Sequence, residues 1–310
     1  MPKYEVHRSI VIAADPQTVF DRVVDYGTWT QWSPWLIAEP EAKVTVSDDP
    51  RSVGSTYAWS GEVVGAGELE HESLKDGEQI RDEIRFLRPM KSVSKVGFDF
   101  KPVDGGTEVT WSMGGSLPFF LFFLKGQIES FVGMDYDRGL RMLKEWIESG
   151  HIESKTTVVG TQSMGPFQVV GVSGQSSLKS IGAAMDEAFS KAQQELDNAG
   201  LPTDGEKVSI YHKFTPKTEH FEFTCGFLFG EPRDSVPSHL SVWHLPQTQA
   251  FRVDHLGSYA NLGNAWSAAN QHVRYKKLKQ STVGTFELYK NSPENAQPSD
   301  LLTEIYLPLK

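Results

Sequence analysis

The hydrophobic pattern of the first half changes its period along the chain. Residues 5–13 predict a strand, and Asp15 followed by Pro16 predicts a helix start, because Asp caps helix N-termini and proline fits the first turn. From residue 128 to 149 apolar positions recur at helical spacing. Between these helices apolar and polar residues alternate in five segments, some joined by glycine turns: 56–59, 67–72, 79–87, 94–102 and 107–113. We therefore expect a strand, a short helix, an antiparallel sheet and a long helix.

Two further features of this half are strongly apolar. Tyr26, Trp29, Trp32 and Trp35 form an aromatic cluster after the short helix. Residues 117–124 form an apolar run that is far too short to cross a bilayer. Three interpretations of this run stay open: a lid over a cavity, a contact with a membrane or a protein partner, and packing against the sheet or the second half of the chain.

The second half contains one pattern twice. The segments 177–185 and 258–266 each begin a helix after a strand, and they share Ser, apolar and Gly positions at a constant offset of 81. Two more strands follow each helix, and Tyr211 in the first set matches Tyr289 in the second at an offset of 78. The sequence therefore predicts two βαββ units that pack as a pseudo-twofold domain.

A chain of 310 residues suits two domains better than one. The stretch 151–157 is polar and without periodicity, so we expect a linker there between domains at 1–150 and 158–310. For the whole chain we predict an α+β fold. Its first domain would be a helix-grip sheet with a long C-terminal helix, and its second the duplicated βαββ domain.

The charge of the chain limits its partners. Its 40 acidic and 30 basic residues give a formal net charge of −10, which disfavours direct binding to nucleic acid. The single cysteine, Cys225, excludes an intramolecular disulfide, and the nine histidines are not spaced as metal ligands, so we expect no metal and no cofactor. The chain begins without a signal-peptide pattern and has no segment long enough to span a bilayer. We expect a soluble, cytoplasmic protein.

The first domain resembles the SRPBCC superfamily, which includes START-like and polyketide cyclase domains. The resemblance spans residues 1–150 and depends on the segment 13–20, the tryptophan-rich segment 29–35 and the long terminal helix. It implies a cavity between helix and sheet that holds apolar molecules, and some members of the superfamily are enzymes.

The second domain resembles the GyrI-like domain, also called the effector-binding domain of bacterial transcription activators. The residues that carry this resemblance are 255–259, Trp266, 285–289 and 302–309. It implies a groove between the repeats that takes small aromatic or cationic molecules, with Glu287 inside it. In this family the domain is often fused to a DNA-binding helix-turn-helix. Here the START-like domain takes that place.

Strand alternation gives Glu287 a physical case of its own. Phe286 and Leu288 share one face of their strand, which we expect to pack against the helices, and Glu287 and Tyr289 share the other. We expect Tyr211 beside them on the symmetry-related strand. A carboxylate between aromatic side chains suits a cation, through charge pairing and cation–π attraction. The alternative is that Glu287 is a solvated strand residue.

Tyr259 and Trp266 complete the predicted ligand-binding set. Their helical spacing is typical of core positions as well as of groove walls. The Trp266 indole N–H needs a partner if the ring is buried.

The sequence supports three kinds of function. The first is binding of a small aromatic, cationic or hydrophobic molecule, for sensing or sequestering. The second is a hydrolase or cyclase acting on small electrophilic or aromatic compounds, with Glu287 as general base and Tyr289 or Tyr211 orienting the substrate. The third is an interaction module that docks through residues 117–124. No Gly-x-Ser-x-Gly motif or phosphate loop is present, which favours the first.

Overall fold

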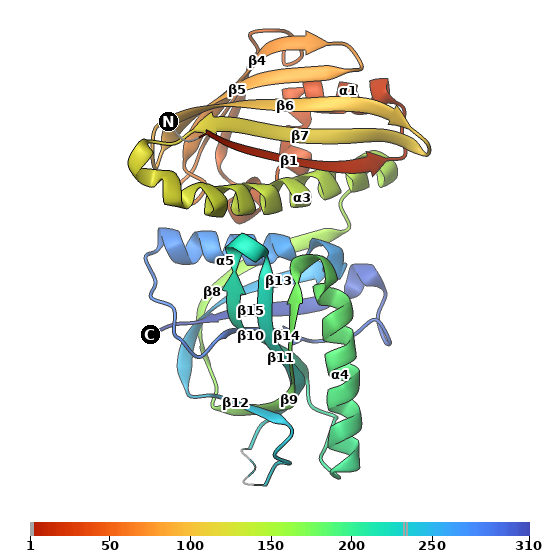
Figure 1. Cartoon of the computed structure of the whole chain (residues 1–310), viewed down its shortest axis with the longest axis vertical. Helices are drawn as coiled ribbons and strands as arrows, with labels where there is room; N and C mark the ends of the chain where they lie inside the picture. Colours follow the sequence, from red (N-terminus) through yellow and green to blue (C-terminus); the bar gives the residue numbers. More distant parts are fainter. Residues whose placement is uncertain (1–2, 232, 234) are drawn as a thin grey trace. The chain divides into compact units, whose positions relative to one another are not determined.

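A computed structural model describes residues 3–231, 233 and 235–310. It divides the chain into two compact units, one ending at Glu153 and one beginning at Ser154 (Figure 1). Each unit combines an antiparallel sheet with helices, so the predicted α+β class is confirmed. Within the described residues, no helix is both long and apolar enough to cross a membrane.

The first unit is a seven-stranded antiparallel sheet with α3 lying along it (Figure 1). The strand order is β1-β7-β6-β5-β4-β3-β2. The strands are β1 (Lys3–Ile12), β2 (Lys43–Val46), β3 (Thr56–Ser60), β4 (Ala66–Lys75), β5 (Gln79–Arg88), β6 (Ser92–Val103) and β7 (Gly106–Ser116). The helices are α1 (Pro16–Val24), α2 (Trp29–Trp32) and α3 (Lys125–Ser149), with the 3-10 helices η1 (Tyr26–Thr28), η2 (Leu36–Ala38) and η3 (Phe119–Leu124).

The start of α1 and the end of α3 depend on single residues. The Asp15 carboxylate accepts hydrogen bonds from the Thr18 amide at 3.0 Å and the Thr18 hydroxyl at 2.6 Å, and Pro16 occupies the first turn. α3 ends at Gly150, whose φ of +84° is a left-handed conformation that glycine adopts without strain. The predicted capped start of the short helix is confirmed.

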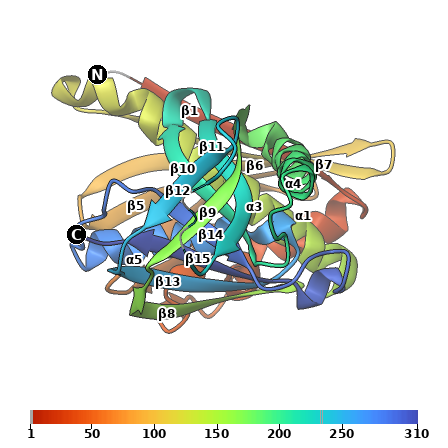
Figure 2. The same ribbon diagram turned by 90° about the horizontal axis from the view of Figure 1, so that it is seen from below.

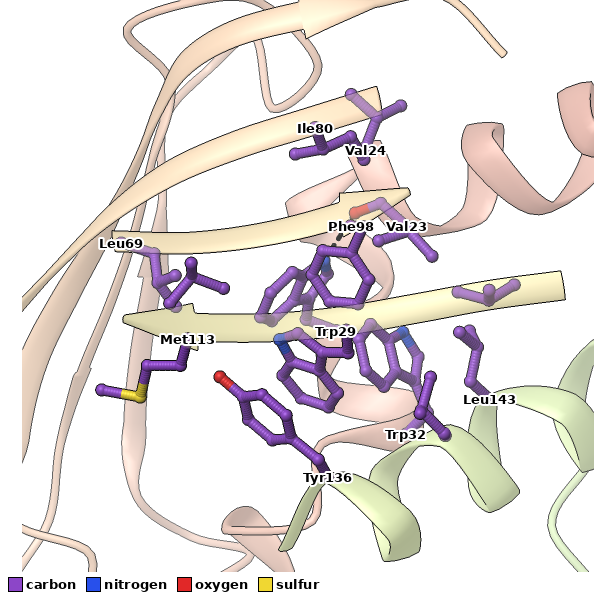
Figure 3. Close-up of a cluster of buried hydrophobic side chains, with 14 of the residues drawn as sticks. Val23, Val24, Trp29, Trp32, Leu69, Ile80, Phe98, Met113, Tyr136 and Leu143 are labelled. Carbon is purple, nitrogen blue, oxygen red and sulfur yellow. Dashed lines mark hydrogen bonds between the residues drawn. The ribbon is translucent and has the colours of Figure 1, made fainter. Parts of the chain in front are cut away.

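Aromatic rings fill the space between the sheet and α3 (Figure 3). The Trp111 ring of β7 stacks on Tyr136 of α3, with centroids 4.0 Å apart, and on Phe98 of β6, with centroids 4.9 Å apart. Trp29 and Trp32, from the aromatic cluster seen in the sequence, are buried among these rings. The resemblance to the SRPBCC superfamily implies an apolar cavity between helix and sheet, and these aromatic side chains lie in that region.

The second unit is an eight-stranded antiparallel sheet with strand order β12-β9-β11-β10-β14-β15-β13-β8. The strands are β8 (Ser154–Met164), β9 (Phe167–Ser177), β10 (Lys207–Thr215), β11 (His220–Phe229), β12 (Ser241–Leu245), β13 (Thr248–Gly257), β14 (Thr285–Tyr289) and β15 (Leu302–Pro308). The helices are α4 (Ile181–Asn198) and α5 (Gly263–Tyr275), with η4 (Leu178–Ser180), η5 (Pro216–Thr218), η6 (Tyr259–Asn261) and η7 (Pro298–Asp300). α4 packs on β9 and β11, and α5 packs on β13, β8 and β15 (Figures 1 and 2).

The strands form two β-β-α-β-β repeats that exchange their first strands. β8 pairs with β13 of the second repeat, and β12 pairs with β9 of the first. At the centre, Ser209 of β10 lies opposite Glu287 of β14, and the register is symmetric about this pair: Lys207 opposite Tyr289 and Tyr211 opposite Thr285. A pseudo-twofold axis therefore passes through the Ser209–Glu287 pair. The predicted duplicated βαββ domain is confirmed, with one additional strand at the start of each repeat.

The segment expected as a linker, 151–157, is in part a strand. β8 begins at Ser154, which lies opposite Gly257 of β13. β8 is the outermost strand of the sheet, and its side chains alternate between exposed and half-buried. The start of this strand consists of Ser, Lys and Thr residues. An edge strand of small polar residues carries little hydrophobic pattern, which explains why the sequence does not reveal it.

Candidate functional site

Glu287 is a charged residue in the interior of the second unit. It lies in the middle of β14 and is only 1% exposed. Strand alternation separates Phe286 and Leu288 from Glu287 and Tyr289, as the sequence predicts. The expectation about the helices is wrong: Glu287 and Tyr289 lie on the face that carries α4 and α5, where they contact Trp266 of α5 and an α4 ring.

The reversed face has a packing reason. Phe286 and Leu288 belong to an apolar core whose buried members all come from strands, with Phe167 of β9 and Trp243 of β12 among them. The Phe286 ring stacks on Tyr306 of β15, with centroids 4.9 Å apart. The sheet therefore buries both of its faces, and apolar strand residues need no helix to cover them.

Both oxygens of the Glu287 carboxylate accept hydrogen bonds from uncharged donors. The Trp266 indole N–H donates to Oε1 at 2.5 Å, and the Tyr289 hydroxyl donates to Oε2. The Ser209 hydroxyl lies 3.2 Å from the Tyr289 hydroxyl and extends the network to the facing strand. The Tyr211 hydroxyl also interacts with the carboxylate. These donors fix the orientation of the carboxylate group without neutralising its charge.

Aromatic rings from both repeats surround this carboxylate. Tyr211 of the first repeat meets Trp266 of the second edge-to-face, with centroids 5.2 Å apart. Tyr289 of the second repeat meets Phe189 of the first in the same geometry at 5.7 Å, and Tyr259 also lies 5.7 Å from Tyr289. All five rings are half-buried, whereas the carboxylate beneath them is buried. We call Glu287, Trp266, Tyr289, Tyr211 and Tyr259 the Glu287 cluster.

The negative charge of the Glu287 carboxylate is not balanced by a basic side chain in the described part of the chain: Glu287 forms no salt bridge with a Lys, Arg or His side chain there. Burial raises the pKa of Glu287, although the hydrogen bonds from Tyr289 and Trp266 offset part of this shift. Burial and the neighbouring carboxylate raise the pKa of Tyr289 and Tyr211 well above the usual value, so both hydroxyls keep their protons and can donate them in hydrogen bonds.

Two family models match the chain. The model described as "Polyketide cyclase / dehydrase and lipid transport" matches residues 3–148, and the GyrI-like small molecule binding domain matches residues 162–310. The chain is a fusion of an SRPBCC domain and a GyrI-like domain. Both families are of small-molecule-binding types, which supports ligand binding as the general property of the chain.

Solved structures show similarity to parts of the chain at low sequence identity. Protein CV1439 from Chromobacterium violaceum is 17% identical with a TM-score of 0.37, over 47% of this chain and 98% of that protein. The Aha1 dimer from Colwellia psychrerythraea is 15% identical with a TM-score of 0.36, over 47% and 97%. EcmrR, solved in complex with DNA, is 18% identical with a TM-score of 0.41, over 61% and 69%. No curated protein matches the chain.

The GyrI-like domain brings together the five residues that the sequence singled out. Glu287 accepts hydrogen bonds from Trp266 and Tyr289. Tyr259 packs on the Tyr289 ring and makes no hydrogen bond with the carboxylate. Sequence reasoning missed Ser209. The duplication could have revealed it, because the offset of 78 that pairs Tyr211 with Tyr289 also pairs Ser209 with Glu287.

A second acidic group of the GyrI-like domain is neutralised internally. Glu304 of β15 forms a salt bridge with Arg252 at 2.6 Å and accepts a hydrogen bond from the Tyr306 hydroxyl at 2.8 Å. Asp254 also pairs with Arg252, at 2.6 Å. Glu304 therefore has the cation that Glu287 lacks. Cys225 is a buried free thiol beside Ser209.

The SRPBCC domain contains a buried ionisable pair that sequence reasoning missed. His71 Nδ1 lies 2.6 Å from Asp82 Oδ1, and Nε2 donates to the Val24 carbonyl at 2.9 Å, with both side chains fully buried. Because a carbonyl only accepts, Nε2 carries a proton, and one further proton is shared between Nδ1 and the carboxyl group. Burial raises the pKa of Asp82. The Tyr26 ring stacks on His71 at 3.9 Å.

His71 and Asp82 lie on the neighbouring strands β4 and β5, eleven residues apart, so no short sequence motif identifies the pair. The described residues contain no group of three or more His, Cys, Asp or Glu side chains arranged to hold a metal ion.

Proposed function

We propose that the Glu287 cluster binds a small aromatic cation, and that the protein is a ligand-binding protein that senses or sequesters such molecules. The observation that supports this proposal is a fully buried carboxylate whose partners among the described residues are all uncharged. Burying an ionised carboxylate without a cation is costly, so such a group is favoured where a ligand supplies the missing charge.

The rings around Glu287 fit the same ligand class. A cation that reaches the carboxylate passes between the half-buried rings of Tyr211, Trp266, Tyr259 and Tyr289. Tyr and Trp faces attract cations by about 0.5–2 kcal/mol each, and aromatic ligands gain additional contact area on them. We assign ligand binding first to the GyrI-like domain, because it contains the buried carboxylate that has no cationic partner among the described residues.

The test compares ligands of similar size that differ in charge. Calorimetric titration at pH 7.5 would use 1-methylquinolinium, a permanent cation, and 2-naphthalenemethanol, which is neutral. We expect the cation to bind more tightly to the wild-type protein, and Glu287→Gln to remove this preference while leaving the affinity for the neutral compound within about threefold. Glu294→Gln, at a side chain that is 80% exposed, is the matched control and should behave as wild type.

Equal binding of both compounds by wild type and Glu287→Gln would contradict the proposal. Loss of both compounds from Glu287→Gln would point instead to a disrupted fold. Far-UV circular dichroism of that variant separates the two results.

One observation favours a second candidate function, hydrolysis or cyclisation of a small electrophilic or aromatic compound. Burial moves the pKa of Glu287 upward, towards the range in which a carboxylate acts as general base, and Tyr289 can donate a hydrogen bond to a substrate oxygen. Hydrolysis of styrene oxide, followed by chromatography of the diol, tests this alternative. Turnover by wild type that Glu287→Gln abolishes would support it. Absence of turnover by wild type together with tight cation binding would favour the ligand-binding function.

A further inference from the structure

Four phenylalanines of η3 are exposed together. Phe119, Phe120, Phe122 and Phe123 are between 59% and 77% exposed, within six residues of chain. Rings packed on the sheet would be buried, so the part of the packing interpretation that places these four rings against the sheet is wrong. Contiguous exposed apolar surface of this kind marks an interaction site.

The turn between β5 and β6 adds three exposed apolar side chains at the same end of the sheet. Leu87, Met90 and Val93 are between 52% and 66% exposed. Phe86 pairs with Ser92 next to this turn, and Lys95 pairs with Gly114 near the end of β7, where the chain continues into η3. The turn and η3 therefore lie at one end of neighbouring strands. We call residues 87–93 and 119–124 the apolar tip.

The charged residues within the apolar tip and directly after it are basic. The segments 86–94 and 117–128 contain Arg88, Lys91 and Lys125 and no Asp or Glu, in a chain whose net charge is −10. The Arg88 guanidinium donates to the Ser60 hydroxyl and the Gly61 carbonyl, which leaves its charge uncompensated. Lys125 lies 3.5 Å from a carboxylate oxygen of Glu129 one turn along α3.

We infer that the apolar tip docks on the surface of an anionic lipid bilayer. Phenylalanine rings enter the boundary between headgroups and acyl chains, and a cationic rim is attracted to anionic headgroups. The rest of this acidic chain is repelled by the same surface, so the charge distribution also orients the molecule with its tip towards the lipid. A second copy of the chain presents the same positive rim, which disfavours tip-to-tip association.

Vesicle sedimentation of the full chain tests the inference. We expect the protein to sediment with vesicles of equal parts phosphatidylglycerol and phosphatidylcholine in 50 mM salt. Binding should be at least tenfold weaker with pure phosphatidylcholine, and at least tenfold weaker in 500 mM salt. The double variant Phe122→Ser/Phe123→Ser should lose binding at least tenfold. Val53→Ser, at a side chain that is 61% exposed and outside the tip, is the matched control and should bind as wild type.

A second double variant keeps the inference falsifiable if the serine variant folds poorly. Arg88→Glu/Lys91→Glu retains every phenylalanine and should abolish the preference for phosphatidylglycerol. Failure of the wild-type protein to sediment with anionic vesicles at low salt would overturn the inference, and so would sedimentation that neither double variant reduces. Self-association in light scattering that the serine variant abolishes, without vesicle binding, would identify a second copy as the occupant instead.

Discussion

The affinity of the Glu287 cluster for a permanent cation should rise with pH. Burial raises the pKa of Glu287 above the usual value of a carboxyl group, despite the hydrogen bonds from Tyr289 and Trp266. The ionised carboxylate attracts a cation and the protonated form does not, so cation binding is linked to loss of this proton. The charge of 1-methylquinolinium does not depend on pH, so the change in affinity reports on the protein.

The magnitude follows from the burial of the carboxylate. Below the raised pKa, each pH unit should strengthen binding about tenfold, or about 1.4 kcal/mol, and above it the affinity should reach a plateau. Unit charges about 4 Å apart attract each other by about 4 kcal/mol at an effective dielectric constant of about 20. Because the amide of Glu287→Gln keeps a dipole at the same place, we expect the plateau of that variant to lie about 3 kcal/mol, or roughly 100-fold, lower.

The stability of the unliganded protein should change in the opposite direction. A group whose pKa is higher in the folded state than in the unfolded state adds stability below the unfolded pKa, and this stability is lost as pH rises through the folded pKa. The melting temperature of the wild type should therefore fall relative to that of Glu287→Gln as pH rises. Saturating cation should restore the wild-type stability, because it binds the ionised folded state.

Titration calorimetry from pH 5 to pH 8 measures the first trend, and calorimetric melting over the same range measures the second. Glu294→Gln serves as the control in both experiments. An affinity that stays constant with pH in the wild type, or that rises equally in Glu287→Gln, would refute the reasoning, since no described Lys, Arg or His side chain forms a salt bridge with this carboxylate.

Substitutions at three positions test other contacts. Trp266→Phe removes the indole donor to Glu287 and should raise the carboxyl pKa further, so the binding profile should shift to higher pH; an unshifted profile would exclude that role. His71→Ala leaves the buried Asp82 carboxyl without its partner and should cost about 3–5 kcal/mol in chemical unfolding, whereas replacing an exposed histidine should cost little. Glu39 accepts three backbone amides at 2.8 to 3.0 Å, so Glu39→Ala should cost about 1–3 kcal/mol and Glu39→Gln less; equal losses would contradict this account.

Hydrophobic periodicity is sufficient to predict most of this fold. The capped start of α1, the long helix α3 and the alternating strands between them follow from local residue choice, because caps and side-chain alternation act over a few residues. The duplication predicts the second sheet, because each half must repeat the arrangement of the other. The positions of β8 and β12 in the sheet do not follow from these patterns, because each of these strands pairs with a strand of the other repeat.

The sequence was less informative about which surface each residue meets. Alternation separates Glu287 and Tyr289 from Phe286 and Leu288, but it does not say which side of the sheet carries the helices. Phe286 and Leu288 face away from the helices because they pack in an apolar core made by strands. The buried residues of this core come from six different strands, so the sequence around β14 does not reveal it. The His71–Asp82 pair is another non-local contact, which no spacing in the sequence indicates.

The position of Glu287 on the pseudo-twofold axis accounts for the asymmetry of the cluster. A duplicated domain places equivalent residues face to face at its axis, so a carboxylate in both repeats would bring two like charges into direct opposition in a buried site. Here Ser209 stands opposite Glu287, and its hydroxyl supports the Tyr289 hydroxyl that donates to the carboxylate. One repeat supplies the charge and the other supplies a neutral contact. The two repeats therefore differ in chemistry at the pair that lies on the axis, where one supplies a buried carboxylate and the other a hydroxyl group.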